Sequence, residues 1–379
     1  MPADKTVSRI TFFTQSLGRT GSEVVLLNLL KHLDTKYSAT LANLYPGELT
    51  GKLPASISQV SLLSQRPGNG FFSRVRHYVE REFLLPVKLR PLSSSIWYIN
   101  TIAMPGLVSY ARKHGIRLVV HVHELEQMFA FRTEQEVRDL VEYPEWILAN
   151  SEATKAVLAL YGRTEKVSVC YPAIDTSVIV RDKTLYFLKR KEMGIDPTDV
   201  LWVMSGTLDR NKDPFLFMQA AVHLLSLQPK AFFAWLGGSQ DVIFEQECKK
   251  ECKRLGLENR FLWLGKTGDQ YLLLFNMADG FLLSSKKESF SLATLEAMLL
   301  GLPVVVNDCG GVSELLGKDI GRIVSADNRA LGLAQEMNAC MNHEWSADAE
   351  KQKLRAREFD ITRIAPVWNK LLNQIINPG

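Results

Sequence analysis

Short apolar runs alternate with longer helical patterns along the whole chain, and the series occurs twice. The runs have the length of strands and the stretches between most of them have the length of helices, a pattern typical of parallel strands joined by crossover helices. In the first series the predicted strands are 10–14, 39–44, 60–63, 96–100, 118–123, 146–150 and 167–171. In the second series they are 200–205, 231–236, 261–264, 280–284, 303–307 and 322–324. The sequence therefore predicts an α/β protein with two successive Rossmann-like layers.

Two layers agree with the length of the chain. A single hydrophobic core stops growing at roughly 250 to 300 residues, and this chain has 379. The rhythm of strands breaks over 173–198, where turn residues and a charged helical stretch suggest a linker. Apolar residues at helical spacing over 360–376 predict a last helix that packs on another part of the protein. We expect domains at 1–176 and 177–357, and a C-terminal helix within 358–379 that crosses back to the first domain.

Composition and charge exclude several classes of function. The 45 basic residues are balanced by 41 acidic ones, too even a balance for a protein whose main partner is nucleic acid. The longest apolar runs fall far short of the roughly 18 residues that span a bilayer. The chain starts with charged residues and no signal-peptide pattern, and its five cysteines suit free thiols in a reducing compartment. We therefore expect a cytoplasmic protein.

Two glutamates eight residues apart, Glu288 and Glu296, mark the main candidate site. Glu288 follows a predicted strand, where open α/β sheets bind ligands, and Glu296 lies in a helix that is apolar on nearly every face. A buried carboxylate needs hydrogen-bond donors, which ribose hydroxyls supply, and the helix start offers amides to a diphosphate. The spacing is equally compatible with a structural arginine beside Glu296 and a solvated Glu288.

The residues that follow the two glutamates carry more information. A helix stop and a buried strand at 301–306, Gly-Leu-Pro-Val-Val-Val, lead into a Gly-Gly turn at 310–311 and another glutamate at 314. This block resembles the donor-site signature of retaining GT-B glycosyltransferases of family 4, the glycosyltransferase group 1 type. Stretches similar to that family extend over almost the whole chain, at 21–29, 121–124, 149–152, 171–175 and 206–212.

The resemblance implies a fold, a reaction and a set of site residues. The fold is GT-B, in which two Rossmann-like domains with parallel sheets face each other across a cleft, the first binding the acceptor and the second the nucleotide sugar. The reaction is retaining transfer of a hexose, with UDP-glucose as the expected donor, to a growing saccharide or lipid-linked glycan in exopolysaccharide or cell-envelope polysaccharide biosynthesis. Beyond this co-substrate no cofactor is expected. The implied catalytic residues are His123, Lys212 and Glu288, and the implied donor-binding residues are Gly21, Arg210, Lys212, Gly265, Lys266, Glu288, Ser289, Phe290, Ser291, Leu292 and Glu296.

Within that set, the resemblance assigns Glu288 to the hydroxyls of the sugar and Glu296 to the ribose. Arg210 and Lys212 follow the first strand of the second domain, and as cations they suit the departing diphosphate. A solvated helix start is the alternative for these two residues, because basic side chains are mostly exposed. The glycine turn at 18–21 is expected under the diphosphate, a plain tight turn being its alternative.

His121 and His123 share one face of a predicted strand, near its carboxyl end. His123 matches the catalytic-site histidine of the family, which contacts the donor sugar, whereas His121 is expected to be structural or on the acceptor side. A metal site needs a third ligand, and the adjacent Glu124 points to the opposite face. No Asp-x-Asp sequence occurs in the chain either, so we expect a transferase that needs no metal.

One stretch of the first domain, 71–90, mixes aromatic, apolar and arginine residues in a helical pattern. Such a helix either lies on an anionic membrane surface or packs on its own sheet. Peripheral contact with the inner face of the plasma membrane is therefore one expectation. Other functions stay open at this point: a non-catalytic partner subunit with the GT-B fold, and a GT-B sugar-nucleotide epimerase or phosphorylase.

Overall fold

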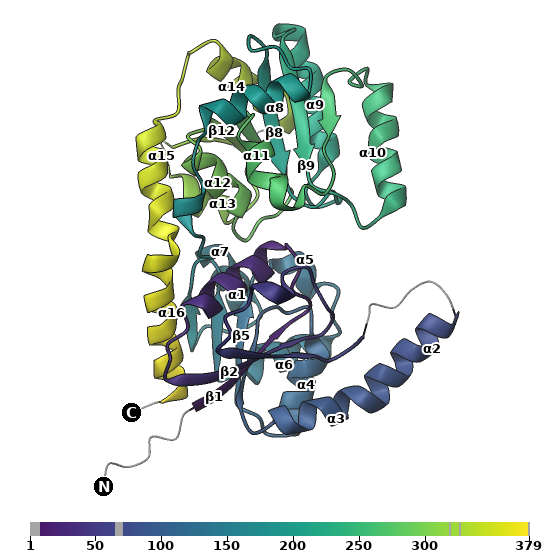
Figure 1. Cartoon of the computed structure of the whole chain (residues 1–379), viewed down its shortest axis with the longest axis vertical. Helices are drawn as coiled ribbons and strands as arrows, with labels where there is room; N and C mark the ends of the chain where they lie inside the picture. The colour runs from purple at the N-terminus through teal and green to yellow at the C-terminus, as the bar shows by residue number, and fades with distance from the viewer. Residues whose placement is uncertain (1–7, 65–70, 318–319, 326, 378–379) are drawn as a thin grey trace. The chain divides into compact units, whose positions relative to one another are not determined.

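The computed structural model describes residues 8–64, 71–317, 320–325 and 327–377, which divide into two compact units (Figure 1). Unit 1 comprises the described residues up to Ile174 together with those from Phe359 onward. Unit 2 runs from Asp175 to Glu358. From sequence we expected the boundaries after residues 176 and 357.

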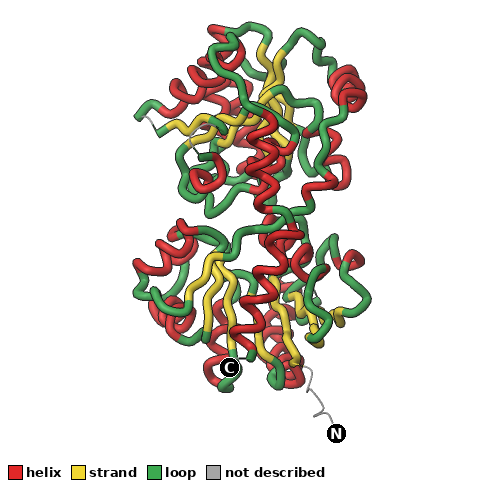
Figure 2. Tube along the Cα trace, turned by 90° about the vertical axis from the view of Figure 1, so that its left-hand side faces the viewer, coloured by secondary structure: helices red, strands yellow, loops and turns green. Residues whose placement is uncertain are grey.

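A seven-stranded parallel sheet forms the centre of unit 1, with the strand order β3-β2-β1-β4-β5-β6-β7. Its strands are β1 (Ser8–Thr14), β2 (Tyr37–Asn43), β3 (Ile57–Ser61), β4 (Ile96–Ile99), β5 (Leu118–Val122), β6 (Trp146–Ala149) and β7 (Val167–Val169). Helices lie on both sides of the strands (Figure 2). Between the strands are α1 (Gly21–Lys31), α4 (Pro105–Lys113), α5 (Glu126–Phe129), α6 (Glu134–Glu142) and α7 (Glu152–Leu160).

Unit 2 is built on a six-stranded parallel sheet with the order β10-β9-β8-β11-β12-β13. The strands are β8 (Val200–Ser205), β9 (Ala231–Leu236), β10 (Phe261–Trp263), β11 (Gly280–Leu283), β12 (Val304–Asn307) and β13 (Arg322–Val324). The helices are α8 (Lys183–Glu192), α9 (Pro214–Leu227), α10 (Val242–Arg254), α11 (Tyr271–Phe275), α12 (Leu292–Leu299), α13 (Val312–Leu316), α14 (Arg329–Met341) and α15 (Ala349–Ala356). Each run predicted as a strand forms one, and the two Rossmann-like layers are confirmed.

Several strands end one residue earlier than predicted, which places polar residues just beyond the sheet of unit 1. Asn100, His123 and Asn150 follow the last residues of β4, β5 and β6. In both sheets the strand order reverses beside the first strand, between β1 and β4 in unit 1 and between β8 and β11 in unit 2. Open α/β sheets bind ligands at the carboxyl ends of the strands at such a reversal. The candidate residues of both units lie at these ends.

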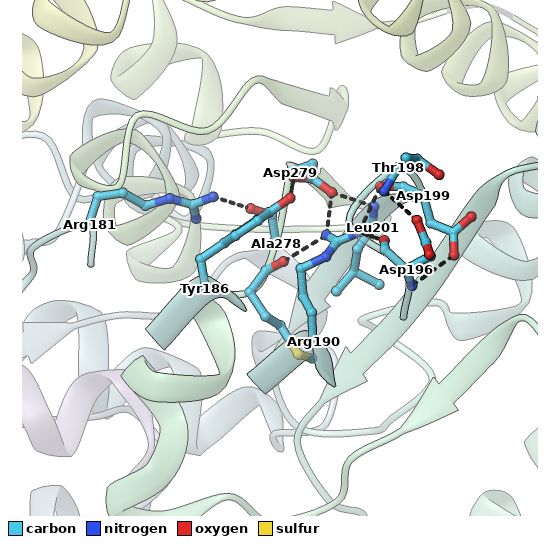
Figure 3. Close-up of polar contacts among 10 residues, drawn as sticks. Arg181, Tyr186, Arg190, Asp196, Thr198, Asp199, Leu201, Ala278 and Asp279 are labelled. Atoms are coloured by element: carbon cyan, nitrogen blue, oxygen red, sulfur yellow. Dashed lines mark hydrogen bonds and ion pairs between the residues drawn. The ribbon is translucent and has the colours of Figure 1, made fainter. Parts of the chain in front are cut away.

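The segment predicted as a linker is instead largely a packed part of unit 2. Its helix α8 buries Arg190, which is 1% exposed and whose guanidinium lies 4.8 Å from the Tyr186 ring centre (Figure 3). That guanidinium donates to Asp279 Oδ2 at 2.6 Å and to the carbonyl oxygens of Asp196 and Asp199 at 2.9 and 2.7 Å (Figure 3). The prediction was wrong because a run of charged residues is typical of a solvated surface, whereas here one cation has enough acceptors to be buried.

The last helix, α16 (Ile361–Ile376), packs on unit 1. Trp368 on this helix is fully buried, and the Asn369 amide donates to the carbonyl oxygen of His32 at 2.8 Å. Not every apolar residue of this helix faces the core, because Val367 is 49% exposed while Ala365 is buried. The C-terminal segment therefore contributes a buried tryptophan to unit 1.

The helical stretch predicted over 71–90 forms α2 (Phe71–Val79), the π-helical segment η2 (Glu80–Leu84) and α3 (Leu85–Leu89), one after another. Its end packs on the core through the buried Leu89 and the partly buried Leu85, and further back His77 stacks on Tyr45. Large apolar side chains along it are exposed, among them Phe72 at 86%, Tyr78 at 60%, Phe83 at 63% and Val87 at 68%. None of the helices in the described part of the chain is long and apolar enough to cross a membrane.

Candidate active site

An ion pair lies where the strand order of unit 2 reverses. Lys212 follows β8 and Glu288 follows β11, and the Lys212 Nζ atom is 2.5 Å from Glu288 Oε1. Glu288 is 8% exposed. Burial by itself would lower the pKa of Lys212, but the adjacent Glu288 carboxylate outweighs it and raises the pKa above its ordinary value. The lysine is therefore held as a cation beside the glutamate.

The loop after β8 fixes the position of Lys212. The Asp209 carboxylate accepts hydrogen bonds from the backbone amides of Asn211 and Lys212, both at 2.9 Å. The Asn211 side-chain amide donates to the carbonyl oxygen of Lys287 at 2.9 Å, which joins this loop to the one after β11. Gly206 has φ of +153°, and a Cβ there would lie 3.0 Å from the Lys212 side chain. A glycine at this position lets the lysine side chain cross the end of the strand.

The loop that carries Glu288 is held by the Gly-Gly turn after β12. The Glu288 amide donates to the carbonyl oxygen of Cys309 at 2.7 Å, and the Gly311 amide donates to the carbonyl oxygen of Glu288 at 2.8 Å. A Cβ on Gly311 would lie 1.8 Å from the carbonyl oxygen of Ser289, so only glycine fits. The Gly-Gly turn, which follows Glu288 in the sequence motif, therefore fixes the position of the Glu288 backbone.

Glu296 has a tyrosine as its partner, not the arginine that spacing left open. Tyr271 Oη donates to Glu296 Oε2 at 2.5 Å and accepts from Ser205 Oγ at 2.9 Å. Burial raises the pKa of Glu296 to about 7, and the hydrogen bond from Tyr271 opposes that rise. Sequence reasoning missed Tyr271. The available signal was a single hydroxyl at the start of an apolar run, directly after the loop at 265–270.

Arg210 is placed differently from Lys212. Its guanidinium pairs with Glu247 Oε2 at 3.1 Å and lies 4.6 Å from the ring centre of Phe244. Both partners are on α10, and the Arg210 side chain is 68% exposed. The structure therefore does not bring Arg210 to the Lys212–Glu288 pair.

The other predicted residues of unit 2 surround the same strand ends. Ser291 caps α12, and its hydroxyl oxygen accepts from the Thr294 amide at 3.3 Å. Leu292 is the first residue of that helix, and Phe290 is 7% exposed. In the loop after β10, the Gly265 carbonyl oxygen accepts from the Gly237 amide at 3.0 Å, and the exposed Lys266 lies beside Gly238.

In unit 1 the glycine turn before α1 is hydrogen-bonded to a carboxylate of the protein itself. The Glu23 carboxylate, 4% exposed, accepts from the amides of Ser16 at 3.2 Å and Thr20 at 3.3 Å. It also accepts from both side-chain hydroxyls of those residues, at 2.5 and 2.7 Å. Gly21 is the exposed first residue of α1. Sequence reasoning treated the turn's amides as open to a ligand anion, and it missed that Glu23 occupies one of them, that of Thr20.

His123 lies just beyond β5, with its Nε2 atom 3.0 Å from Asn100 Oδ1. Burial lowers its pKa well below the ordinary value, and the neighbouring His121 lowers it further. His121 is fully buried with Nδ1 2.7 Å from Tyr98 Oη, and burial lowers its pKa to about 3. Both imidazoles are therefore neutral near pH 7. Asn100 and Tyr98 were missed from sequence, since nothing local marks them as partners of these histidines.

Metal ligands do not gather at these positions. In the ranges that the structure describes, no group of three or more His, Cys, Asp or Glu side chains is placed to hold a metal ion. Cys248 and Cys252 are buried on α10, and burial raises the pKa of both thiols, that of Cys248 to about 12. Buried thiols of this kind behave as small apolar side chains.

Comparison with known sequence families covers both units. Residues 187–359 match the family described as glycosyl transferases group 1, and residues 19–178 match the one described as glycosyltransferase family 4. The chain belongs to the group 1 glycosyltransferases. Its motif around Glu288 and Glu296 lies within the first match, and Gly21 and His123 lie within the second.

Two curated relatives illustrate the range of this glycosyltransferase family. The chain is 32% identical to the lipopolysaccharide core biosynthesis mannosyltransferase LpsB of Rhizobium meliloti, over 46% of this chain and 52% of LpsB. It is 23% identical to a Campylobacter jejuni α-1,4-N-acetyl-D-galactosaminyltransferase named for a PP-undecaprenol-linked glycan, over 97% of this chain and 99% of that enzyme. The chain thus spans about half of LpsB and nearly all of the Campylobacter enzyme.

Solved structures show the same fold for this glycosyltransferase. HepE of Anabaena, in complex with UDP and glucose, is similar with a TM-score of 0.82 and 20% identity, covering 97% of this chain and 100% of HepE. WaaG, a glycosyltransferase involved in lipopolysaccharide biosynthesis, is similar with a TM-score of 0.73 and 15% identity, covering 98% and 100%. The expected GT-B fold is confirmed.

Proposed function

We propose that the chain transfers a hexose, foremost glucose from UDP-glucose, to a hydroxyl of a growing saccharide or lipid-linked glycan. The observation that carries this proposal is the partly buried Lys212–Glu288 pair at the reversal of strand order in unit 2, with Glu296 on the next helix. A cation beside a carboxylate at such a point suits a ligand with a diphosphate next to sugar hydroxyls. The likeness to HepE, solved with UDP and glucose, supports this choice of donor.

The proposed chemistry is transfer with retention and without a metal ion. The acceptor hydroxyl oxygen forms a bond to the anomeric carbon on the face from which the diphosphate leaves. The bond between that carbon and the β-phosphate oxygen breaks, its electron pair stays on the phosphate, and the hydroxyl proton passes to the departing diphosphate. Lys212 stabilises the charge that develops on the diphosphate, because it is a preorganised cation in a partly buried site.

The remaining roles follow from chemical type and position. Glu288 accepts hydrogen bonds from the sugar hydroxyls, and Glu296 accepts them from the ribose. The α12 amides near Leu292 face the diphosphate, to which a helix start is favourable. His123 contacts the sugar as a neutral ring. Arg210 joins the diphosphate only if it leaves Glu247.

Acceptor-dependent release of UDP tests this proposal. Purified protein is given UDP-glucose with membranes or lipid-linked oligosaccharide from a producing strain, with and without EDTA, and the anomeric configuration of the product is read by NMR. We expect UDP only when acceptor is present, turnover in EDTA, and an α product from the α-configured donor. Lys212→Met should lower kcat/KM on the order of 10² to 10³-fold, the usual effect of losing one donor to a developing oxyanion.

A second ion pair in unit 2 provides the matched control. Lys249 pairs with Glu245 at 2.6 Å on α10, a Lys–Glu contact of similar length on a solvent-exposed helix. Lys249→Met should leave turnover unchanged, because exposed pairs contribute little. Equal activity of Lys212→Met and Lys249→Met would contradict the catalytic assignment and favour a non-catalytic subunit. Product formed from the nucleotide sugar without acceptor would favour an epimerase instead.

We further propose that the α2–η2–α3 segment contacts an anionic membrane from the cytoplasmic side. Its exposed apolar side chains include Phe72 and Phe83, arginine or lysine stands at positions 74, 76, 81 and 88, and Arg90 follows directly after it. An amphipathic helix with basic residues binds anionic lipid through buried apolar area and charge. A lipid-linked acceptor, such as the one in the name of the Campylobacter relative, would be reached from that surface.

Co-sedimentation with vesicles tests the membrane contact. The chain should bind vesicles rich in phosphatidylglycerol and not pure phosphatidylcholine, and 0.5 M salt should release it. The double variant Phe72→Ser with Phe83→Ser should abolish binding. Ile243→Ser on α10, where Ile243 is 71% exposed, is the control and should bind as before. Equal sedimentation of both variants would show that this segment is not the contact.

A further inference from the structure

Asn100 joins three elements of unit 1 beside His123. It follows β4, is 1% exposed, and its backbone amide donates to the carbonyl oxygen of Phe13 at 2.9 Å. Its side-chain amide donates to the carbonyl oxygen of Ser22 on α1 at 2.9 Å. Its side-chain oxygen lies 3.0 Å from His123 Nε2. A single buried amide therefore connects the start of α1 with the histidine.

These contacts determine which atom of Asn100 faces the histidine. A backbone carbonyl oxygen only accepts hydrogen bonds, so the NH₂ group of Asn100 must be the one that faces Ser22. The Oδ1 atom then faces His123, and an amide oxygen also only accepts. His123 Nε2 must therefore carry a proton. In a neutral imidazole the lone pair is then on Nδ1.

The neighbouring His121 belongs to a separate series of contacts. The Trp368 indole N–H, which only donates, lies 3.1 Å from Tyr98 Oη. The Tyr98 oxygen accepts from it and lies 2.7 Å from His121 Nδ1, a contact that fits either tautomer of His121 because a hydroxyl both donates and accepts. The two imidazole rings are in contact, with centres 4.1 Å apart.

We propose that Asn100 is a positioning residue that holds His123 as the Nε2–H tautomer, so that the ring acts at Nδ1 as a hydrogen-bond acceptor for a hydroxyl of the bound sugar. The assignment of that hydroxyl to a bound sugar rests on the proposed function, whereas the assignment of the tautomer does not. A histidine fixed in this way does not act as a general acid toward the leaving group. This agrees with a mechanism in which the hydroxyl proton goes to the diphosphate.

The tautomer can be measured without donor or acceptor. The protein is labelled with ¹⁵N-histidine, whose seven residues are few enough to assign, with His123→Asn and His121→Asn identifying the two signals. Two-bond ¹H–¹⁵N correlation spectra distinguish a protonated from an unprotonated ring nitrogen. We expect His123 to show a protonated Nε2 and an unprotonated Nδ1 from pH 6 to pH 8. A protonated Nδ1, or an imidazolium in this range, would overturn the proposal.

Three variants separate positioning from structure. Asn100→Ala removes the acceptor, so His123 should become a mixture of tautomers and kcat should fall on the order of tenfold, the equivalent of one ordinary hydrogen bond. Asn100→Asp supplies a carboxylate that favours the imidazolium, and His123 should then titrate at a higher pH than in the wild type. It also serves as the second measurement if the alanine variant does not fold. Asn28→Ala is the control, since Asn28 likewise donates to a backbone carbonyl oxygen, that of Ala173, at 3.2 Å.

The outcomes distinguish this inference from the proposed function. Asn28→Ala should keep both the tautomer and the wild-type kcat. An unchanged His123 spectrum in Asn100→Ala and Asn100→Asp would show that Asn100 positions nothing, whatever the enzyme transfers. The protein could instead show the expected spectra and yet release no UDP with any acceptor. That result would establish the tautomer and would count only against the proposed glycosyl transfer.

Discussion

The carboxyl of Glu296 should make binding of the nucleotide sugar depend on pH. Its pKa is raised to about 7 by burial, and ribose hydroxyls donate best to its ionised form. The apparent dissociation constant is then the intrinsic one divided by the ionised fraction, which is about 0.9 at pH 8 and about 0.1 at pH 6. Affinity for UDP-glucose should therefore fall about tenfold from pH 8 to pH 6, the equivalent of about 1.4 kcal/mol.

Isothermal titration calorimetry with UDP-glucose measures this change of affinity with pH. UDP-glucose is preferable to UDP, because a terminal phosphate has a second pKa near 6 and would add its own slope. Other groups of the site titrate elsewhere: the pKa of Lys212 is raised above its ordinary 10.5, and that of His123 lies well below 6.5. Glu296→Gln should bind with the same affinity at pH 6 and pH 8. Tyr271→Phe removes the hydrogen bond that lowers the pKa of Glu296, so the loss of affinity should begin at a higher pH.

The raised pKa of Glu296 should also make the stability of the protein without ligand depend on pH. Stability should fall as pH rises, whereas the affinity for UDP-glucose should increase. The pKa of Glu296 is about 7 in the folded chain, above its ordinary value of 4.5, so folding favours the protonated form. That stabilisation is complete below pH 4.5 and is lost as pH rises to 7, about 3 kcal/mol in all. At pH 8 Glu296→Gln should therefore be more stable than wild type toward urea, by up to about 3 kcal/mol, because the pKa of Glu296 already includes the effect of the Tyr271 hydrogen bond. If the affinity for UDP-glucose changed equally with pH in wild type and Glu296→Gln, the assignment of the pH dependence to Glu296 would be refuted.

Two substitutions in unit 2 test how its elements are held together. Arg190→Met should lower the free energy of unfolding by about 3 kcal/mol, because it leaves Asp279 without its buried cation. Arg254→Met breaks an exposed ion pair on α10 and should change the free energy of unfolding by less than about 1 kcal/mol, measured by urea titration of both variants. Gly311→Ala should displace the Glu288 loop and reduce binding of UDP-glucose in calorimetry, whereas Gly106→Ala, with no atom within 4 Å of its Cβ, should bind as wild type. Equal binding by both alanine variants would contradict the fit described for the Gly-Gly turn.

The strands could be predicted because the signal for a buried parallel strand is local. Val304, Val305 and Val306 are completely buried, and such a run needs no knowledge of its neighbours to be recognised. Helix α8 could not be placed in the same way. Arg190 is buried because Asp279, nearly ninety residues away, supplies a carboxylate. A charged segment has the same local pattern whether such an acceptor exists or not, so it was taken for a linker.

The site shows the same division between local and distant information. Glu288, Glu296 and Lys212 were predicted because each belongs to a motif that is contiguous in sequence. Tyr271, the partner of Glu296 in unit 2, and Asn100, the partner of His123 in unit 1, were not predicted, since the order of strands in each sheet decides which loops meet. Each of these two is a single polar residue at the edge of an apolar run. Spacing does not distinguish it from an ordinary surface residue.

The charged groups of each unit also differ from the picture that the motifs suggest, because they already have internal partners. In unit 2 Lys212 pairs with Glu288 and Tyr271 donates to Glu296, and in unit 1 Glu23 accepts from the amides of Ser16 and Thr20. A nucleotide sugar that uses these groups must exchange partners with them, so each contact contributes only the difference between the old hydrogen bond and the new one. Removing one member of a pair leaves the other buried and unsatisfied, which costs stability as well as binding. Neutral variants that keep shape, such as Glu296→Gln, are therefore the changes that separate recognition of the donor from folding of the site.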